Sequence, residues 1–211
     1  MKNINNFPMD TFWYIDCSNM IVRKESGDMK KLRILCDADD TIQELTIHWL
    51  AELNNKYNCN VRKEDIKTWD MTKAFPGLSE EEVLEPLYRS DFWSTTTPIE
   101  GSKHYLKRLI DDGHEVLIVT ASNPETFEAK KRKLIEMFPF LTTDQIICEN
   151  NKQSVKGDIL IDDGVHNLLG GSYQKFLFNQ PNNLTFDEKL YDITRVYSWK
   201  EIYERISSMV A

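Results

Sequence analysis

Two carboxylates stand two positions apart directly after an apolar run. The run Leu32–Cys36 ends at Asp37, and the chain continues through Asp39 and Asp40 to Thr41. On a turn that leaves a strand, Asp37 and Asp39 can point the same way, and their repulsion raises a pKa unless a cation lies between them. Mg²⁺ is the usual hard cation beside phosphate, so the segment predicts metal-assisted phosphate chemistry. The plain alternative is a solvated acidic turn that caps a helix.

A hydroxyl group follows a second apolar run in the same way. Val116–Val119 leads into Thr120, and Ser122 comes two residues later. Hydroxyls and backbone amides between a strand and a helix suit an anion such as phosphate. Taken alone, this segment is explained more simply by Ser122 as an ordinary N-cap.

An acidic pair follows a third apolar run. Asp162 and Asp163 come directly after the run 158–161. Charged residues seldom follow a buried strand unless they have a function. The functional interpretation is a second contribution to a metal site, and the alternative is an Asp-Gly turn. Upstream, Lys152, with Lys156 as a rival, can neutralise a phosphate and a carboxylate together, although most lysines are simply solvated.

The elements that must position these side chains alternate between strands and helices. Apolar runs predict strands at 32–36, 116–119, 145–148, 158–161, 175–178 and 195–197. Periodicity and capping residues predict helices from Ile42 onward (apolar face Ile42, Leu45, Trp49, Leu50, Leu53), over 102–110, from Ser122 or Asn123 to about Phe138, and over 199–209. The order predicts an α/β fold, a Rossmann-like parallel sheet with helices on both faces. Ligands bind outside the carboxyl ends of such strands, so the three polar segments are expected at one edge.

Composition narrows the class of protein. The 211 residues carry 26 Lys+Arg and 34 Asp+Glu, so the formal charge is 26 − 34 = −8, and 41% of residues are hydrophobic. This balance excludes a wholly disordered chain, and the acidity argues against duplex nucleic acid as a partner. No apolar run approaches the roughly 20 residues of a membrane span, and the polar start lacks a secretory signal, so no membrane partner and a cytoplasmic location are expected.

The four cysteines do not form a metal or disulfide pattern. They are Cys17, Cys36, Cys59 and Cys148, and none is part of a CxxC pair. Reduced thiols are expected, and zinc is not. Cys36 and Cys148 lie in apolar runs, which predicts that both are core residues.

Residues 1–28 are interpreted as an N-terminal extension. Two short β-prone runs, 12–15 and 20–23, flank a turn candidate at Ser18-Asn19, and Met29-Lys30-Lys31 resembles the start of many cytoplasmic chains. The extension is either a hairpin added to the sheet or a loosely held arm, and the pattern favours the hairpin.

The joint order of these motifs is more specific than any one of them. Strand-DxDxT, strand-Thr, Lys and strand-DD, from Leu32 to the end of the chain, resembles the haloacid dehalogenase-like superfamily of phosphohydrolases. Within it, the chain resembles the 5'(3')-deoxyribonucleotidase family, the cytosolic and mitochondrial type C pyrimidine nucleotidases. That closer likeness rests on the spacing, the length, segments 35–41 and 160–163, and the tail segment 177–183.

The resemblance implies a Mg²⁺-dependent phosphomonoesterase with an aspartyl-phosphate intermediate. Asp37 would be the nucleophile, and Asp39 would protonate the leaving alcohol and later activate water. Thr41 would help to fix Asp39. The metal set would comprise Asp37, Asp39 through its carbonyl, and the final acidic pair, with Asp163 preferred over Asp162.

The same resemblance implies the phosphate-binding residues. Thr120 and Lys152 would hold the phosphoryl oxygens on which the transition state spreads its charge. Ser122 is a further candidate on the same segment. The expected partner is a small-molecule phosphomonoester, a nucleoside monophosphate by preference.

The chain is long enough for a cap between the first two motifs. Thr41 and Thr120 are 120 − 41 = 79 residues apart, whereas a bare crossover needs about 30 residues. Residues 56–100 are therefore interpreted as a small helical cap, with the core at 29–55 and 101–211. Aromatic residues in the cap can stack a base or fill the cap's own core. These are Trp69, the leading candidate for base stacking, Phe75, Phe92 and Trp93.

One position departs from the family pattern, and other functions stay open. The family has an aromatic residue eight positions after the nucleophile, where this chain has Leu45. The enzymatic alternative is a phosphatase for a sugar phosphate or a nucleic-acid end. The non-catalytic alternatives are a phosphoacceptor receiver domain and a binding module of the same fold. The motifs do not decide the base, the sugar, the position of the phosphate or whether the chain forms a homodimer.

Overall fold

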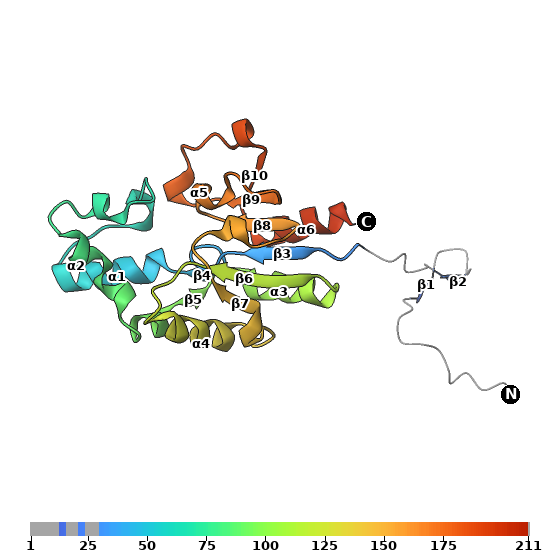
Figure 1. Ribbon diagram of the computed structural model, residues 1–211, viewed down its shortest axis with the longest axis horizontal. Coiled ribbons are helices and arrows are strands. Elements are labelled where there is room, and N and C mark those ends of the chain that lie inside the picture. Colours follow the sequence, from blue (N-terminus) through green and yellow to red (C-terminus); the bar gives the residue numbers. More distant parts are fainter. Residues whose placement is uncertain (1–12, 16–20, 24–29, 211) are drawn as a thin grey trace.

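The computed structural model describes residues 13–15, 21–23 and 30–210. A six-stranded parallel sheet with the order β10-β9-β8-β3-β6-β7 forms its centre (Figure 1). The strands are β3 (Arg33–Cys36), β6 (Glu115–Thr120), β7 (Ile146–Cys148), β8 (Ile159–Asp162), β9 (Gln174–Phe178) and β10 (Ile193–Val196). After β3 the chain adds β6 and β7 on one side of this strand and then β8, β9 and β10 on its other side. This arrangement confirms the predicted α/β class and all six predicted strands.

Helices cover both faces of the sheet. Alternate residues of β3 point to opposite faces, so Ile34 and Cys36 pack in one hydrophobic cluster and Leu35 in another. The first face carries α3 (Ser102–Asp111), α4 (Phe127–Met137) and α6 (Trp199–Met209), and the second carries the short α5 (Val165–Leu168).

The segment between β3 and α3 builds a helical unit with its own hydrophobic cluster. It contains α1 (Thr46–Tyr57), η1 (Lys63–Asp65), η2 (Met71–Ala74), α2 (Glu80–Leu84), η3 (Glu85–Tyr88) and η4 (Phe92–Thr95). Its two ends are joined by an antiparallel pair, β4 (Gln43–Glu44) with β5 (Thr97–Pro98). In Figure 1 this unit (cyan to green) lies beyond the carboxyl end of β3. A cluster from Leu45 to Trp93 fills its interior.

Three local predictions are wrong. The helix expected from Ile42 begins at Thr46, because a tight turn and β4 come first, and Ile42 packs in the sheet core. The helix expected from Ser122 or Asn123 begins at Phe127, after a turn in which the amide of Phe127 donates to the carbonyl of Asn123 (3.0 Å). Cys148 is exposed because β7 is an edge strand, whereas Cys36 is buried as predicted.

The remaining elements link or extend the sheet. Within the core they are η5 (Thr143–Gln145), η6 (Lys152–Ser154), η7 (Pro181–Asn183) and η8 (Glu188–Tyr191). In the extension, β1 (Trp13–Ile15) and β2 (Ile21–Arg23) pair antiparallel with each other, as the predicted hairpin requires. The six-stranded sheet does not include them, so the hairpin does not extend it. The predicted turn at Ser18-Asn19 lies outside the described residues.

Across residues 13–15, 21–23 and 30–210, no helix has the length and apolar character needed to cross a membrane.

Candidate active site

Three carboxylates meet at the carboxyl ends of two neighbouring strands. The register pairs Cys36 of β3 with Ile161 of β8, so Asp37 leaves β3 level with the end of β8. The amide of Asp37 donates to the carbonyl of Ile161 (2.9 Å), which holds this alignment. Asp37, Asp162 and Asp163 are all buried and offer oxygens within 4.8 Å of one another. The parallel sheet therefore brings the first and last predicted acidic segments together.

Lys152 is the cation of this cluster. Its Nζ pairs with Asp37 Oδ1 and lies 2.7 Å from Asp162 Oδ2, with 2% of its side chain exposed. The rival Lys156 is exposed and takes no part. Burial lowers the pKa of Lys152, but Asp162 and Asp37 outweigh burial, and the net pKa is raised. Lys152 therefore stays charged inside the site.

The cluster holds more negative charge than Lys152 can balance. Burial is the largest cause that raises the pKa of Asp37, to about 7, with Lys152 opposing it and Asp162 and Asp39 adding to it. Burial, followed by Asp162, likewise raises the pKa of Asp163 well above its ordinary value. A bound cation relieves this type of strain.

The oxygens available for a cation can be told apart by their partners. Asp162 is fully engaged: its Oδ2 accepts from Lys152, and its Oδ1 accepts from the Gly164 amide (2.7 Å) and from Asn167 (3.1 Å). Asp163 Oδ1 is buried and has no hydrogen-bond partner among the described residues. The donor set of hard carboxylate oxygens fits a divalent cation, and Asp163 rather than Asp162 presents the free oxygen.

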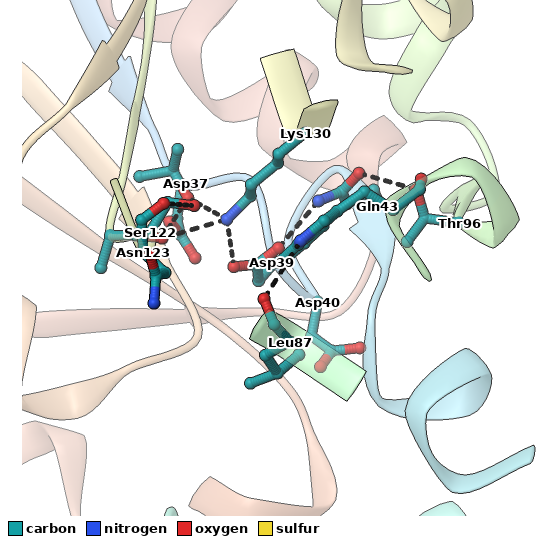
Figure 2. Close-up of polar contacts among 12 residues, drawn as sticks. Asp37, Asp39, Asp40, Gln43, Leu87, Thr96, Ser122, Asn123 and Lys130 are labelled. Carbon is teal, nitrogen blue, oxygen red and sulfur yellow. Dashed lines mark hydrogen bonds and ion pairs between the residues drawn. The ribbon is translucent and has the colours of Figure 1, made fainter. Parts of the chain in front are cut away.

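Asp39 belongs to a different network from the acidic cluster. Its Oδ2 accepts from Lys130 Nζ (2.6 Å), and its Oδ1 accepts from Gln43 Nε2 (2.8 Å). Figure 2 shows Lys130 between Asp39 and the segment after β6, and Gln43 between Asp39 and Thr96. Lys130 also donates to Thr120 Oγ1 (2.8 Å) and to the carbonyl of Ala121 (3.0 Å). Lys130 thus ties Asp39 to the predicted phosphate-binding segment.

Sequence reasoning missed Lys130, although the sequence contains a signal for it. The side chain is 1% exposed and lies with its Nζ 4.7 Å from the ring centroid of Trp93. Phe127, Lys130 and Leu134 share one face of α4 at helical spacing, so a lysine occurs within an apolar stripe. A buried lysine needs a carboxylate partner, and Asp39 provides it.

The three predicted hydroxyl residues differ in their surroundings, and Thr120 lies at the end of β6 as predicted. Thr41 Oγ1 is buried without a hydrogen-bond partner among the described residues, and it is Gln43 and Lys130 that hold Asp39. The Thr120 hydroxyl accepts from Lys130, and Ser122 Oγ contacts the carbonyl of Asn123 at 3.5 Å. Roles for Thr41, Thr120 and Ser122 toward phosphate remain predictions.

An arginine with only 8% of its side chain exposed holds the segment behind Asp163. Arg195 of β10 donates to the side chains of Asn179 (3.0 Å) and Asn183 (2.7 Å) and pairs with Glu188 (3.0 Å). Asn183 in turn donates to the carbonyl of Asp163 (2.9 Å). The sequence resemblance included segment 177–183 but did not reveal that it supports the acidic pair.

The acidic cluster opens into a cavity of about 520 Å³, a size typical of small-molecule sites. Asp37, Asp39, Lys152 and Asp163 line its inner end. The outer wall is mainly apolar and comes from the inserted segment: Leu45, Trp49, Ile66, Trp69, Met71, Leu84 and Leu87. The cavity therefore joins an anionic, lysine-containing centre to an apolar wall.

Comparison with known proteins identifies the family. Residues 30–211 match the family described as "5' nucleotidase, deoxy (Pyrimidine), cytosolic type C protein". The chain belongs to this family. A 5'(3')-deoxyribonucleotidase of Bacillus subtilis (strain 168) is 31% identical over 182 residues, covering 84% of this chain and 99% of the relative. A second, from Clostridium acetobutylicum, is 28% identical over 155 residues, covering 74% and 86%.

A solved structure shows the same fold. A HAD family hydrolase from Deinococcus radiodurans R1, with bound phosphate and sodium, is similar with a TM-score of 0.61 at 14% identity, covering 86% of this chain and 97% of that one. Family and fold confirm the predicted superfamily and the prediction of a phosphomonoester hydrolase. They decide against a non-catalytic phosphoacceptor domain.

Within this nucleotidase family member, the aromatic candidates separate by position. Trp69 lines the cavity, is 59% exposed and meets the ring of His166 edge to face, with centroids 4.6 Å apart. Phe75, Phe92 and Trp93 are buried in the hydrophobic cluster that runs from Leu45 to Trp93 and do not line the cavity. Sequence reasoning missed two lining aromatic rings, Trp49 on the apolar face of α1 and His166 on α5. Leu45, at the position where the sequence resemblance predicts an aromatic residue, also lies in the wall.

Proposed function

We propose that the protein is a Mg²⁺-dependent phosphomonoesterase that removes phosphate from deoxynucleoside monophosphates. The observation that carries this proposal is the buried cluster of Asp37, Asp163 and Lys152 at the inner end of an apolar-walled cavity. A phosphate group fits the inner end and a nucleoside fits the wall. The relatives named 5'(3')-deoxyribonucleotidase support the choice of substrate.

In this proposal Asp37 is the nucleophile. An Asp37 carboxylate oxygen forms a bond to phosphorus while the bond from phosphorus to the leaving oxygen breaks, which leaves an aspartyl phosphate. Asp39 donates a proton to the departing alkoxide. It then takes a proton from the water that attacks phosphorus, and cleavage of the bond to Asp37 releases inorganic phosphate. The amide of Asp37 holds the backbone at the strand end, so the nucleophile starts from a fixed position.

Mg²⁺ would be held by Asp37, Asp163 and the carbonyl of Asp39, and it supplies positive charge between the anionic nucleophile and the anionic substrate. Lys152 adds a positive charge for the phosphoryl oxygens. Its partners Asp37 and Asp162 both belong to the acidic cluster, so they hold its Nζ at the place proposed for the phosphate. Lys130 and Gln43 orient Asp39 toward the cavity.

The apolar wall would bind the nucleoside and distinguish it from other leaving groups. Trp69, with Trp49 and Leu45 nearby in the same wall, offers a ring surface on which a base can stack. The free nucleotide is a small-molecule partner, and we propose the cytoplasm as the place of action, which the family description supports.

A phosphate-release screen tests this function. Purified protein is assayed with Mg²⁺ or with EDTA against 5' and 3' deoxynucleoside monophosphates, ribonucleotides and sugar phosphates. We expect Mg²⁺-dependent release that is fastest with a deoxynucleotide. Faster turnover of sugar phosphates would contradict the substrate, and equal rates in EDTA would contradict the metal requirement.

A further inference from the structure

Asp40 occupies a backbone conformation that favours glycine. Its φ is +48°, in the left-handed region, and its amide donates to the carbonyl of Gln43 (2.8 Å) to close a tight turn. Glycine adopts this conformation without a steric penalty. Other residues are disfavoured there, although Asp and Asn are tolerated better than most. The turn alone therefore does not require a carboxylate at this position, and the carboxylate has contacts of its own.

The Asp40 carboxylate joins the catalytic loop to the inserted segment. It accepts from the amide of Thr46 (3.1 Å) at the start of α1, and it lies 3.4 Å from Lys63 Nζ at the start of η1. The Asp40 and Lys63 side chains are only 11% and 17% exposed, so solvent screens their attraction weakly. Lys63 also pairs with Glu44 (2.8 Å), next to the junction formed by β4 and β5.

The two ends of this link belong to different parts of the chain, the catalytic loop and the segment between β3 and α3. Asp40 follows Asp39 directly, and its carbonyl accepts from Gln180 Nε2 (2.6 Å), which anchors it to the core. Lys63 precedes a segment that supplies much of the cavity wall. The lining residues of that segment are Ile66, Thr68, Trp69, Asp70, Met71 and Thr72.

We propose that the Asp40–Lys63 ion pair is a positioning link that holds the wall formed by residues 66–72 at a fixed distance from the reacting carboxylates. Neither Asp40 nor Lys63 belongs to the group of carboxylates that could hold a metal, so in this proposal the pair acts on recognition of the leaving group rather than on the chemistry. This role deepens the proposed function and rests on it for its effect on turnover.

The test compares two substrates across matched variants. Asp40→Asn keeps the shape and tolerates the left-handed turn, Lys63→Met removes the charge of the partner, and Lys63→Arg retains it. Lys107→Met, which breaks the exposed Lys107–Asp111 pair of α3, is the control. Each protein is assayed with a deoxynucleoside monophosphate and with a small alkyl phosphate.

We expect Asp40→Asn and Lys63→Met each to lower kcat/KM for the nucleotide by about 5- to 20-fold, mostly through KM. The alkyl phosphate should lose less than about threefold, Lys63→Arg should recover most of the loss, and the double variant should be no worse than Lys63→Met. Equal losses on both substrates, or additive losses in the double variant, would overturn the proposal.

A second measurement does not depend on turnover. Hydrogen exchange of residues 63–72 should be about tenfold faster in Lys63→Met than in the wild type and unchanged in Lys107→Met. Unchanged exchange in Lys63→Met would overturn the link even if the enzyme is active. A wild type that hydrolyses no phosphomonoester would instead refute the proposed function, and the exchange result would still decide the link.

Discussion

The two ends of the cavity are built in different ways. At the inner end, Asp37 and Asp163 are buried and follow β3 and β8, where ladder hydrogen bonds set their positions, and the buried Lys152 comes from η6. At the outer end, the wall comes from helices and turns between β3 and α3; Trp69 is exposed, whereas Trp49 and Met71 are buried. The positions of the reactive groups at the inner end therefore depend on the sheet. Side chains of the wall can be substituted without disturbing the sheet.

The two ends of the cavity also differ in how their residues contribute to stability. Charges in the inner end are costly to bury and need each other or a cation. The wall gains stability from apolar burial that many side chains can provide. Substitutions at the inner end should abolish chemistry, and substitutions in the wall should change the choice of substrate.

The largest effect is expected at the nucleophile. Asp37→Asn should lower phosphatase activity by at least about 10³-fold, because an amide cannot form the acyl phosphate. Phosphate release is measured on protein whose circular dichroism matches the wild type. Normal turnover by the folded variant would refute the mechanism at the inner end.

The next effect tests the newly found lysine. Lys130→Met should reduce kcat by about 10²-fold, because Asp39 loses the donor that orients it for proton transfer. Lys133→Met, three residues along the same helix and paired with Glu136 (3.1 Å), is the matched control. Assays are run well below the melting temperatures of both variants, and similar rates in the two would exclude a role for Lys130.

The wall should respond selectively. Trp69→Ala should lower kcat/KM for a deoxynucleoside monophosphate by about 5- to 150-fold, since stacking on an aromatic ring is worth about 1–3 kcal/mol. A small alkyl phosphate should change little. Tyr88→Ala removes an equally exposed aromatic residue of the same unit that does not line the cavity. If both substrates fall equally in Trp69→Ala, Trp69 only supports the cap.

A smaller effect concerns stability without metal. The folded state raises the pKa of Asp37 to about 7, above about 3.9 in the unfolded chain. Between these values the unfolded chain releases its proton first, so the free energy of unfolding falls as pH rises from about 4 to 7. Asp37→Asn should remove this loss and be more stable than the wild type by on the order of 1–3 kcal/mol at pH 8.

Urea denaturation in EDTA at several pH values measures this difference. Added Mg²⁺ should then stabilise the wild type more than the variant. Parallel pH curves for the two proteins would show that Asp37 is not under electrostatic strain.

The smallest effect is expected outside both regions. A chain that begins at Met29 should keep kcat/KM within about twofold of the full-length protein, because every motif lies after that residue. A truncated protein that folds with the same melting temperature but has lost its activity would place residues 1–28 in the site.

The sequence by itself determined the sheet and the acidic centre. Apolar runs that end in Asp37, Thr120 and Asp162 predicted strand ends, and parallel strands place their carboxyl ends at one edge. Their order along the chain was enough to identify the superfamily. Local patterns were sufficient here because the same short segments form the strands and carry the reactive groups.

Tertiary structure decided which side chains complete that centre. Arg195 and Gln43 look like ordinary polar residues of short strands, and Lys130 is marked only by its place in an apolar stripe. Packing brings Lys130 and Gln43 to Asp39, and Arg195 to the segment behind Asp163. The wall depended on packing even more. Trp69 and Trp93 look alike in the sequence, but Trp69 lines the cavity and Trp93 is buried in the cluster from Leu45 to Trp93. The packing of the segment between β3 and α3, rather than any local pattern, sets the direction of each ring.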